Sequence, residues 1–211
     1  VQFSLGQYRT ICNGRDLRTR PGDYVIDGGG CWGDTALMFA HAAGLSGRVF
    51  SFEFVDDNLA IFRRNLALNP HLEPQITIVE RALWEKSDLS LNFQSNGPAT
   101  YLSTSDDSAQ KSVGTLAIDD LVARHDLPRV DFIKLDIEGA ELAALRGAEK
   151  TLRRFRPIVA AAVYHNIGDF HSLAEYLDSL GVGYRFCLRH FTIHAEETML
   201  FAWASDETAS P

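Results

Sequence analysis

The chain has 211 residues, of which 45% are hydrophobic and 23% charged, a composition typical of a globular protein rather than a disordered or fibrous one. The formal net charge of −8 argues against a broad nucleic-acid-binding surface, because phosphate binding needs clustered Lys and Arg. No run approaches the roughly 18 apolar residues that span a bilayer, so no membrane span is expected.

The cysteines Cys12, Cys31 and Cys187 are odd in number and far apart in the sequence, and they form no C-x-x-C pair. This pattern disfavours a disulfide framework and a zinc site, and it fits a reducing compartment such as the cytoplasm. No signal peptide opens the sequence, which begins without Met as an excised domain would. We expect one domain over residues 1–204 and a flexible tail over 205–211.

Strand-type and helix-type segments alternate along the chain, which predicts a mostly parallel sheet with helices on both faces. In chain order, strands are expected at 24–27, 47–53, 75–83, 130–136 and 157–165. Helices are expected at 34–43, around Leu59, Phe62 and Leu66, at 119–124, at 139–152 and at 170–180.

Two segments break this alternation. Residues 95–112 are rich in Ser, Asp, Gly and Thr, which predicts a long mobile loop and makes it the candidate lid. The last strands, at 184–188 and 198–203, are joined by a turn too short for a crossover helix. They are therefore expected to pair antiparallel.

The stretch YVIDGGGCWGDT, residues 24–35, contains Gly28, Gly30 and Gly33 in a G-x-G-x-x-G pattern between a strand and a helix. Such a turn lets a ligand approach bare backbone. Glu53 ends the next strand, where an acidic residue can bind both hydroxyls of a ribose. A tight turn with a helix-capping Asp and no ligand is the non-functional alternative.

Asp27 separates the two cofactors that fit this pattern, NAD and S-adenosylmethionine. Beside a pyrophosphate its carboxylate would be a like charge in a poorly solvated site. Beside the sulfonium and ammonium of S-adenosylmethionine it would be attractive. No Arg follows Glu53 to hold a 2′-phosphate, so NADP fits least. S-adenosylmethionine is therefore favoured over NAD.

A second group of polar residues follows the fourth and fifth strands. Asp136 ends the segment at 130–136, and Glu138 follows it two residues later. Tyr164 and His165 end the segment at 157–165. Ligands bind beyond the carboxyl ends of parallel strands, so these groups are expected to meet near the glycine loop. Helix capping by Asp136 or Glu138, and a surface hydrogen bond for His165, are the structural alternatives.

These motifs resemble the FkbM-type family of S-adenosylmethionine-dependent methyltransferases. The resemblance rests on PGDYVIDGGGCWGDT, FSFEFVDDN, VDFIKLDIEGAELAALRGAEKTL and PIVAAAVYHNIGDF, and it covers roughly residues 22–203. It implies a Rossmann-like class I methyltransferase fold with a seven-stranded sheet, and O-methylation of a hydroxyl on a sugar or small natural product. The cofactor-binding residues are then expected to be Asp27, Gly28, Gly29, Gly33, Thr35 and Glu53.

The expected catalytic residues are Asp136, Glu138 and His165. Methyl transfer to an alcohol needs a proton acceptor, and His165 or Asp136 is the candidate. A divalent metal held by these side chains is possible but not favoured. The expected partner is a small-molecule or sugar acceptor, and no nucleic acid. The alternative functions are an NAD-dependent oxidoreductase and a non-catalytic cofactor-binding module of a larger glycan-building protein.

Overall fold

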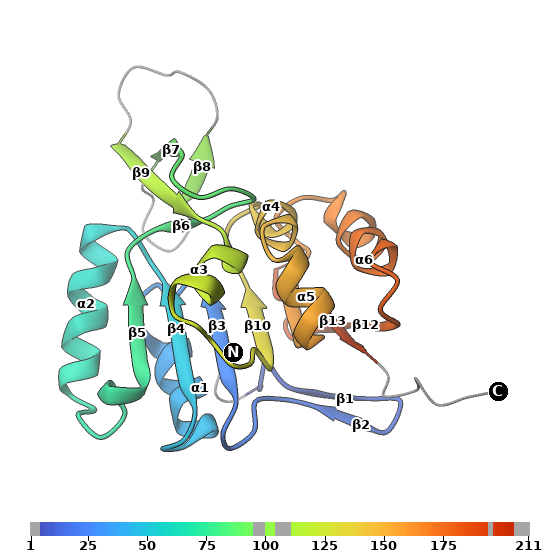
Figure 1. Cartoon of the computed structure of the whole chain (residues 1–211), viewed down its shortest axis with the longest axis horizontal. Coiled ribbons are helices and arrows are strands. Elements are labelled where there is room, and N and C mark those ends of the chain that lie inside the picture. The colour runs from blue at the N-terminus through green and yellow to red at the C-terminus, as the bar shows by residue number, and fades with distance from the viewer. Residues whose placement is uncertain (1–4, 95–99, 104–110, 194–195, 205–211) are drawn as a thin grey trace.

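The computed structural model describes residues 5–94, 100–103, 111–193 and 196–204 of the chain. Its centre is a seven-stranded sheet with the order (Figure 1) β12 (Tyr184–His190), β13 (Thr198–Ala204), β11 (Ile158–Ala162), β10 (Phe132–Leu135), β3 (Tyr24–Gly28), β4 (Arg48–Phe52) and β5 (Ile76–Val79). Strand β13 pairs antiparallel with β11 and β12, whereas the other pairs are parallel. The predicted fold class, including the antiparallel C-terminal pair, is confirmed.

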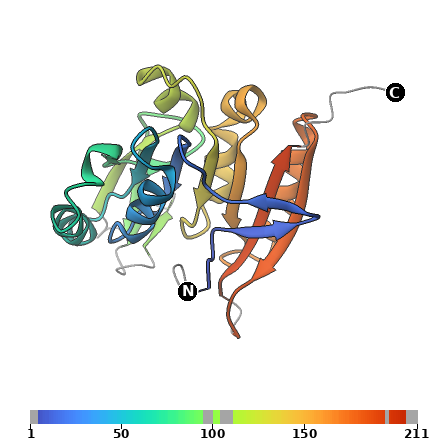
Figure 2. The same cartoon turned by 90° about the horizontal axis from the view of Figure 1, so that it is seen from below.

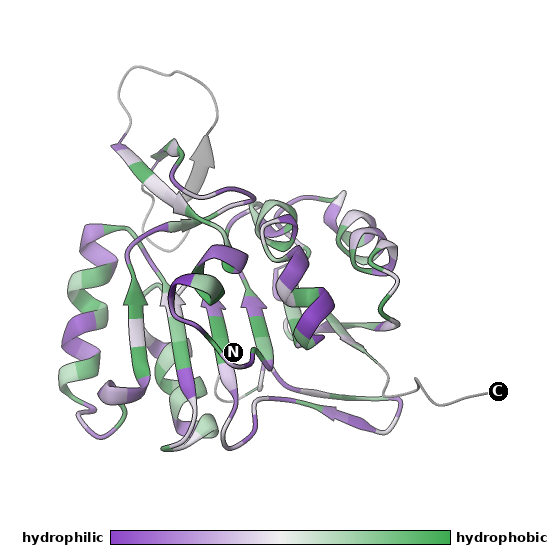
Figure 3. Cartoon of the chain, in the orientation of Figure 1, coloured by the Kyte–Doolittle hydropathy of each residue, from purple (hydrophilic) through white to green (hydrophobic). Residues whose placement is uncertain are grey.

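Helices cover both faces of this sheet (Figure 2). One face packs against α1 (Asp34–Ala43) and α2 (Asp56–Ala67), and the other against α3 (Ile118–Arg124), α4 (Glu141–Arg146), α5 (Glu149–Phe155) and α6 (Asp169–Ser179). Successive strand residues point to opposite faces, so Phe132 joins the α1 core and Ile133 the other. The central strands are accordingly mostly hydrophobic (Figure 3).

The segment at 139–152, expected as one helix, forms two. Gly147 lies at the break, where a Cβ atom would lie 2.2 Å from the carbonyl oxygen of Trp84, so only glycine fits. The carboxylate of Asp119 accepts hydrogen bonds from the backbone N–H groups of Lys150 and Thr151, at 2.9 and 2.8 Å. Because a side chain from α3 supplies this cap, α5 begins anew after the break.

A second sheet has the order β6 (Ala82–Leu83), β9 (Lys111–Leu116), β7 (Ser90–Gln94) and β8 (Tyr101–Ser103), and it projects beyond the carboxyl ends of the main strands (Figure 1). It divides the strand expected at 75–83, which forms β5 and β6 after the short 3₁₀ helix η1 (Glu73–Gln75). It also replaces part of the loop expected at 95–112. Residues 95–99 and 104–110 of that candidate lid lie outside the described residues.

A hairpin of β1 (Thr10–Cys12) and β2 (Arg15–Leu17) precedes the main sheet and was not predicted. The Arg189 guanidinium on β12 donates hydrogen bonds to the hydroxyl of Thr10 and the carbonyl oxygen of Ile11, at 2.9 and 2.8 Å. These bonds attach the β1–β2 hairpin to the edge strand β12, which lies near the other end of the sequence.

The cysteines Cys12, Cys31 and Cys187 are all free thiols. Cys12 and Cys187 nevertheless lie in contact, because the hairpin packs on β12. Burial, and then the neighbouring Cys12, raise the pKa of the Cys187 thiol to about 12. The Cys187 thiol therefore stays protonated near neutral pH.

Within the described residues, no helix combines the length and apolar character needed to cross a membrane. The tail expected at 205–211 lies outside the described residues.

The glycine at the N-cap of α1 gives a test of the fold. Gly33 has φ +81°, and a Cβ atom there would lie 2.1 Å from Cδ2 of Phe62. Gly33→Ala should therefore lower the free energy of unfolding by about 2–4 kcal/mol, combining backbone strain with overpacking. Gly14, in the turn between β1 and β2, has φ +78° but nothing within 4 Å of its Cβ position.

Gly14→Ala is the matched control, because it has nearly the same φ as Gly33 and adds backbone strain without a close contact, at a cost of about 1 kcal/mol. Urea unfolding of both variants measures the difference. Equal losses would show that the contact with Phe62 does not restrict position 33.

Candidate active site

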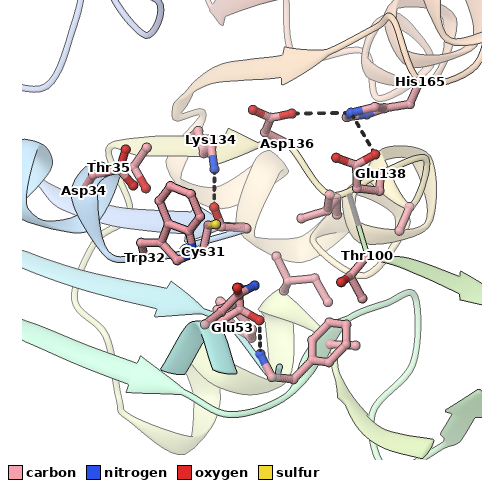
Figure 4. A pocket seen from close by; sticks show the side chains of 18 of the residues that line it. Cys31, Trp32, Asp34, Thr35, Glu53, Thr100, Lys134, Asp136, Glu138 and His165 are labelled. Atoms are coloured by element: carbon pink, nitrogen blue, oxygen red, sulfur yellow. Dashed lines mark hydrogen bonds and ion pairs between the residues drawn. The ribbon is translucent and has the colours of Figure 1, made fainter. Parts of the chain in front are cut away.

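A cavity of about 620 Å³ lies over the carboxyl ends of β3, β4, β10 and β11 (Figure 4). It is bounded by the glycine loop, by residues that follow β4 and β10, and by Tyr164 and His165 after β11. The second sheet contributes Leu83 and Thr100 to the wall. Of the predicted cofactor residues, Gly29, Thr35 and Glu53 line this cavity, as do all three predicted catalytic residues.

The glycine loop is shaped first by contacts within the protein. A Cβ atom at Gly29, which has φ +84°, would lie 2.1 Å from the carbonyl oxygen of Asp136. At Gly28 it would lie 2.8 Å from the Leu83 side chain, and Gly28 and Gly33 do not line the cavity. The loop glycines therefore let β3, β10 and α2 approach one another, and Gly29 also exposes backbone to the cavity.

Asp27 is fully buried beneath the loop and does not line the cavity. Its carboxylate accepts hydrogen bonds from the hydroxyls of Thr35 and Ser51, at 2.9 and 2.7 Å. It lies 3.3 Å from the Lys134 ammonium, so its cationic neighbour belongs to the chain itself. The sequence predicted that Asp27 favours a cationic ligand. Because Asp27 does not line the cavity, that preference depends on the acids that do line it.

Lys134 was missed by the sequence argument. Its ammonium is buried and donates hydrogen bonds to the carbonyl oxygens of Gly28 and Gly29, at 2.8 and 2.7 Å. It also lies 5.4 Å from the centre of the Tyr8 ring. A lysine inside the otherwise apolar strand sequence FIKL was the available signal, because a buried charge requires a partner.

Glu53 follows β4 and is held in one orientation. Its Oε1 accepts the backbone N–H groups of Phe54 and Val55, at 2.6 and 2.7 Å, and its Oε2 accepts the Asn58 amide at 3.1 Å. Burial raises the pKa of this carboxyl, and these hydrogen bonds oppose the shift. Glu53 and Asn58 both line the cavity and together offer acceptors and a donor to a pair of hydroxyls.

The structure brings Asp136, Glu138 and His165 together (Figure 4). Nε2 of His165 lies 3.6 Å from Asp136 Oδ1 and 3.5 Å from Glu138 Oε2. Asp136 also accepts hydrogen bonds from the hydroxyls of Tyr8 and Tyr164, at 2.8 and 2.9 Å. Asp136 is therefore held by several donors, whereas the Glu138 side chain, 30% exposed, lines the cavity and forms an ion pair with the imidazole.

Neither predicted carboxylate caps the following helix, since α4 has no side-chain cap. Glu138 instead occupies a left-handed backbone conformation, φ 55°, which costs a non-glycine residue about 1–3 kcal/mol. Such a strained conformation persists only where the surrounding structure imposes it. With this backbone conformation, the Glu138 side chain lines the cavity.

Glu141, in the motif IEGAE, was not among the expected site residues. Its side chain is fully buried, and its Oε1 accepts the backbone N–H of Ile137 at 2.9 Å and faces Nδ1 of His165 at 2.8 Å. The hydrogen bond fixes the imidazole so that Nε2 points toward Asp136 and Glu138. The second glutamate of the motif was the available sequence signal.

His165 is charged in this environment. Burial opposes the imidazolium, but the neighbouring Glu138 carboxylate, the hydrogen bond to Glu141 and the charge of Asp136 outweigh it and raise the pKa of His165 to about 10. An imidazolium cannot accept a proton, so this environment favours a carboxylate as the proton acceptor. Burial and Asp136 also raise the pKa values of Tyr8 and Tyr164, which keeps both phenols neutral donors.

Among the described residues, no group of three or more His, Cys, Asp or Glu side chains is arranged to hold a metal ion. Lys134 and the protonated His165 supply positive charge in the cavity, so the carboxylates have internal counterions.

A parallel sheet with this strand order, covered by helices on both faces and holding its cavity at the carboxyl ends, is the fold of class I methyltransferases. A sequence model described as the methyltransferase FkbM domain matches residues 9–186. The chain therefore belongs to the FkbM methyltransferase family.

Solved structures agree on the fold. Methyltransferase FkbM from Methylobacillus flagellatus KT superposes with a TM-score of 0.71 at 24% identity, over 89% of this chain and 45% of that one. This chain thus spans less than half of that relative. An S-adenosylmethionine-dependent O-methyltransferase from Thermotoga maritima gives 0.54 at 16% identity, over 91% and 63% of the two chains.

Fibrillarin from Aeropyrum pernix, in complex with natively bound S-adenosyl-L-methionine, gives a TM-score of 0.54 at 14% identity, over 87% of this chain and 67% of that one. A comparison with curated proteins gave no significant match.

The charge of His165 can be measured directly. We expect its imidazole to stay protonated at pH 8 and to titrate near a pKa of about 10 in NMR spectra of ¹⁵N-labelled protein. Glu138→Gln should lower that pKa, because it removes one of the carboxylates that oppose burial. A value near the ordinary 6.5 in the wild type would contradict the assignment.

The same shift has a consequence for stability. Between pH 6.5 and about 10, the folded state holds a proton on His165 that the unfolded state releases. The free energy of unfolding should therefore fall with rising pH in that window, by up to about 1.4 kcal/mol per pH unit. In His165→Gln this contribution to the slope should vanish.

Proposed function

We propose that this protein transfers a methyl group from S-adenosylmethionine to a hydroxyl of a sugar or small natural product. The observation that carries the proposal is that one cavity joins Glu53 and Asn58 after β4 to the cluster of Asp136, Glu138 and His165. The first group suits the ribose of a nucleoside, and the second suits an acceptor that must lose a proton.

The charge of the cavity supports S-adenosylmethionine over a dinucleotide. Acids outnumber bases among the described residues that line it: Asp34, Glu53, Asp136, Glu138, Glu196 and Glu197, against Arg81, Lys134 and His165. Asp34 lies at the start of α1, where the pyrophosphate of a dinucleotide would need a helix N-terminus free of negative charge. A sulfonium and an ammonium are favoured in the same place.

The cofactor would be held by the backbone at Gly29, by Thr35 near the start of α1, and by Glu53 with Asn58. When bound, S-adenosylmethionine supplies an electrophilic methyl group on a sulfonium. The residues of the chain orient the two ligands, exclude water and take up the proton of the acceptor hydroxyl. Asp27 and Lys134 support the loop from below.

On the acceptor side, we assign proton uptake to the carboxylate of Glu138. The Asp136 carboxylate already accepts hydrogen bonds from the hydroxyls of Tyr8 and Tyr164 and lies 3.6 Å from Nε2 of His165, so its oxygens are occupied by groups of the chain. Glu138 has fewer partners and greater exposure, so its carboxylate is better able to accept a hydrogen bond from an acceptor hydroxyl. The positively charged His165 then positions both carboxylates.

Cofactor binding is the first test. Glu53→Gln should weaken S-adenosylmethionine binding, measured by isothermal titration calorimetry, by about 1–3 kcal/mol because a charged hydrogen-bond acceptor is lost. Glu149→Gln is the control, since Glu149 is exposed on α5 and pairs with Arg153 away from the cavity. Equal affinity in the Glu53 variant would reject the assignment, and tighter binding of NAD to the wild type would reject the cofactor.

Turnover is the second test, after sugar nucleotides and polyols have been screened for an acceptor by formation of S-adenosylhomocysteine. Glu138→Gln should lower kcat by about 10² or more, the usual contribution of a general base. Its affinity for S-adenosylmethionine should be unchanged. A larger loss in Asp136→Asn than in Glu138→Gln would move proton uptake to Asp136.

The same turnover assay tests whether the reaction needs a divalent metal. Turnover should persist in the presence of a chelator, because the His165 imidazolium lies beside the carboxylates of both Asp136 and Glu138. Loss of turnover that Mg²⁺ or Mn²⁺ restores would instead assign a metal to the acceptor side.

A further inference from the structure

A second cavity of about 620 Å³ lies away from the carboxyl ends of the sheet. It is enclosed by the N-terminal segment at Gly6, Tyr8 and Arg9, by residues 18–21 before β3, and by the C-terminal half of α1. Apart from Tyr8, which also lines the active-site cavity, no residue here takes part in the proposed methyl transfer.

The wall of this second cavity is basic. Arg9, Arg18, Arg20 and His41 line it, and the described residues of its lining include no Asp or Glu. Such a concentration of arginine contrasts with the net charge of −8 for the whole chain. An electropositive hollow on an acidic protein attracts an anion, because its field is focused between low-dielectric walls.

Two of the arginines are held in place by Asp16, which is not part of the lining. Nε of Arg18 lies 2.8 Å from the Asp16 carboxylate, and Nη2 of Arg20 donates to the Asp16 carbonyl oxygen at 3.1 Å. Each contact uses one edge of a guanidinium, which leaves further N–H groups for a ligand. The forked donors of arginine match the oxygens of a phosphate.

The remaining wall is apolar and comes from Met38, Phe39 and Ala42 of α1 with Pro21. We infer that this cavity binds a small organic molecule that carries a phosphate group, with the phosphate on Arg18 and Arg20 and the organic part against α1. Arg9 and His41 extend the basic rim on either side. The inference does not depend on the proposed methyl transfer.

Tyr8 connects this site with the active site. Its ring packs 5.9 Å from that of Phe39 in the arginine-lined cavity, and its hydroxyl donates to Asp136 at 2.8 Å. The phosphate could belong to one end of the methyl acceptor or to a separate effector. The first would compete with acceptor binding, whereas the second would change kcat through Tyr8 without competition.

Isothermal titration calorimetry of the full chain with phenyl phosphate tests the site, with inorganic phosphate and uncharged phenol as comparisons. Phenyl phosphate should bind saturably and more tightly than either. Arg18→Gln/Arg20→Gln should weaken it about tenfold or more, because charge-assisted hydrogen bonds are lost. The control is Lys150→Gln/Arg154→Gln on α5, which removes the same charge from exposed positions and should leave binding unchanged.

Absence of saturable binding to the wild type in the millimolar range would overturn the site. So would equal losses in the arginine and control variants, which would indicate nonspecific attraction. Steady-state kinetics with phenyl phosphate then separates competition with the acceptor from an effect on kcat.

Discussion

The ion pair between Lys134 and Asp27 is the interaction on which the active-site region depends. The parallel register places Lys134 opposite Asp27 and Asp27 opposite Ser51, so three adjacent strands form one polar row on a single face of the sheet. Both charges are buried, and loss of either would leave the other uncompensated, at a cost of about 3–5 kcal/mol. The same ammonium holds the carbonyl oxygens of the glycine loop.

The row ties the geometry of the cofactor loop to the register of the sheet. A slip of one residue in β10 would move Lys134 to the opposite, apolar face and remove the counterion of Asp27. The parallel strands on which the cavity depends are therefore specified by electrostatics as well as by hydrophobic burial. A sheet whose faces were entirely apolar would lack this constraint.

Much of the fold could be predicted from the sequence because hydrophobic periodicity marks strands such as 24–27 and helices such as 34–43 with little ambiguity. The meeting of Asp136 and His165 could also be predicted, since both follow neighbouring parallel strands. The environment of Asp27 could not, because its partner lies more than a hundred residues away and only strand register brings the two together.

The other features that the sequence did not predict also depend on contacts between residues far apart in the chain. Tyr8 reaches Asp136 only because the N-terminal segment crosses the sheet, and Glu141 reaches His165 only through the turn after β10. The break at Gly147 reflects the approach of Trp84 from a distant loop. Strand β7, SLNFQ, alternates polar and apolar residues but β9, KSVGTL, does not, so their pairing required the structure.

The cavity also gathers hydrogen-bond donors around a cluster of acids at close range. The protonated His165 and the two neutral phenols are donors, and most of them converge on Asp136. Each donor lowers the repulsion among the carboxylates, while Glu141 supplies the negative charge that keeps the imidazole protonated. The donors that surround these carboxylates, Tyr8, Tyr164 and His165, are thus groups that cannot themselves act as bases near neutral pH.

The attachment of the first residues to the last strands sets an order for chain assembly. Tyr8 is separated from Asp136 by 128 residues, and Arg189 from Thr10 by 179. During synthesis the N-terminal segment emerges first, but its partners do not exist until most of the chain has followed. Contacts of such long sequence separation are slow to form. The segment that completes the wall between the two cavities should accordingly be among the last to dock.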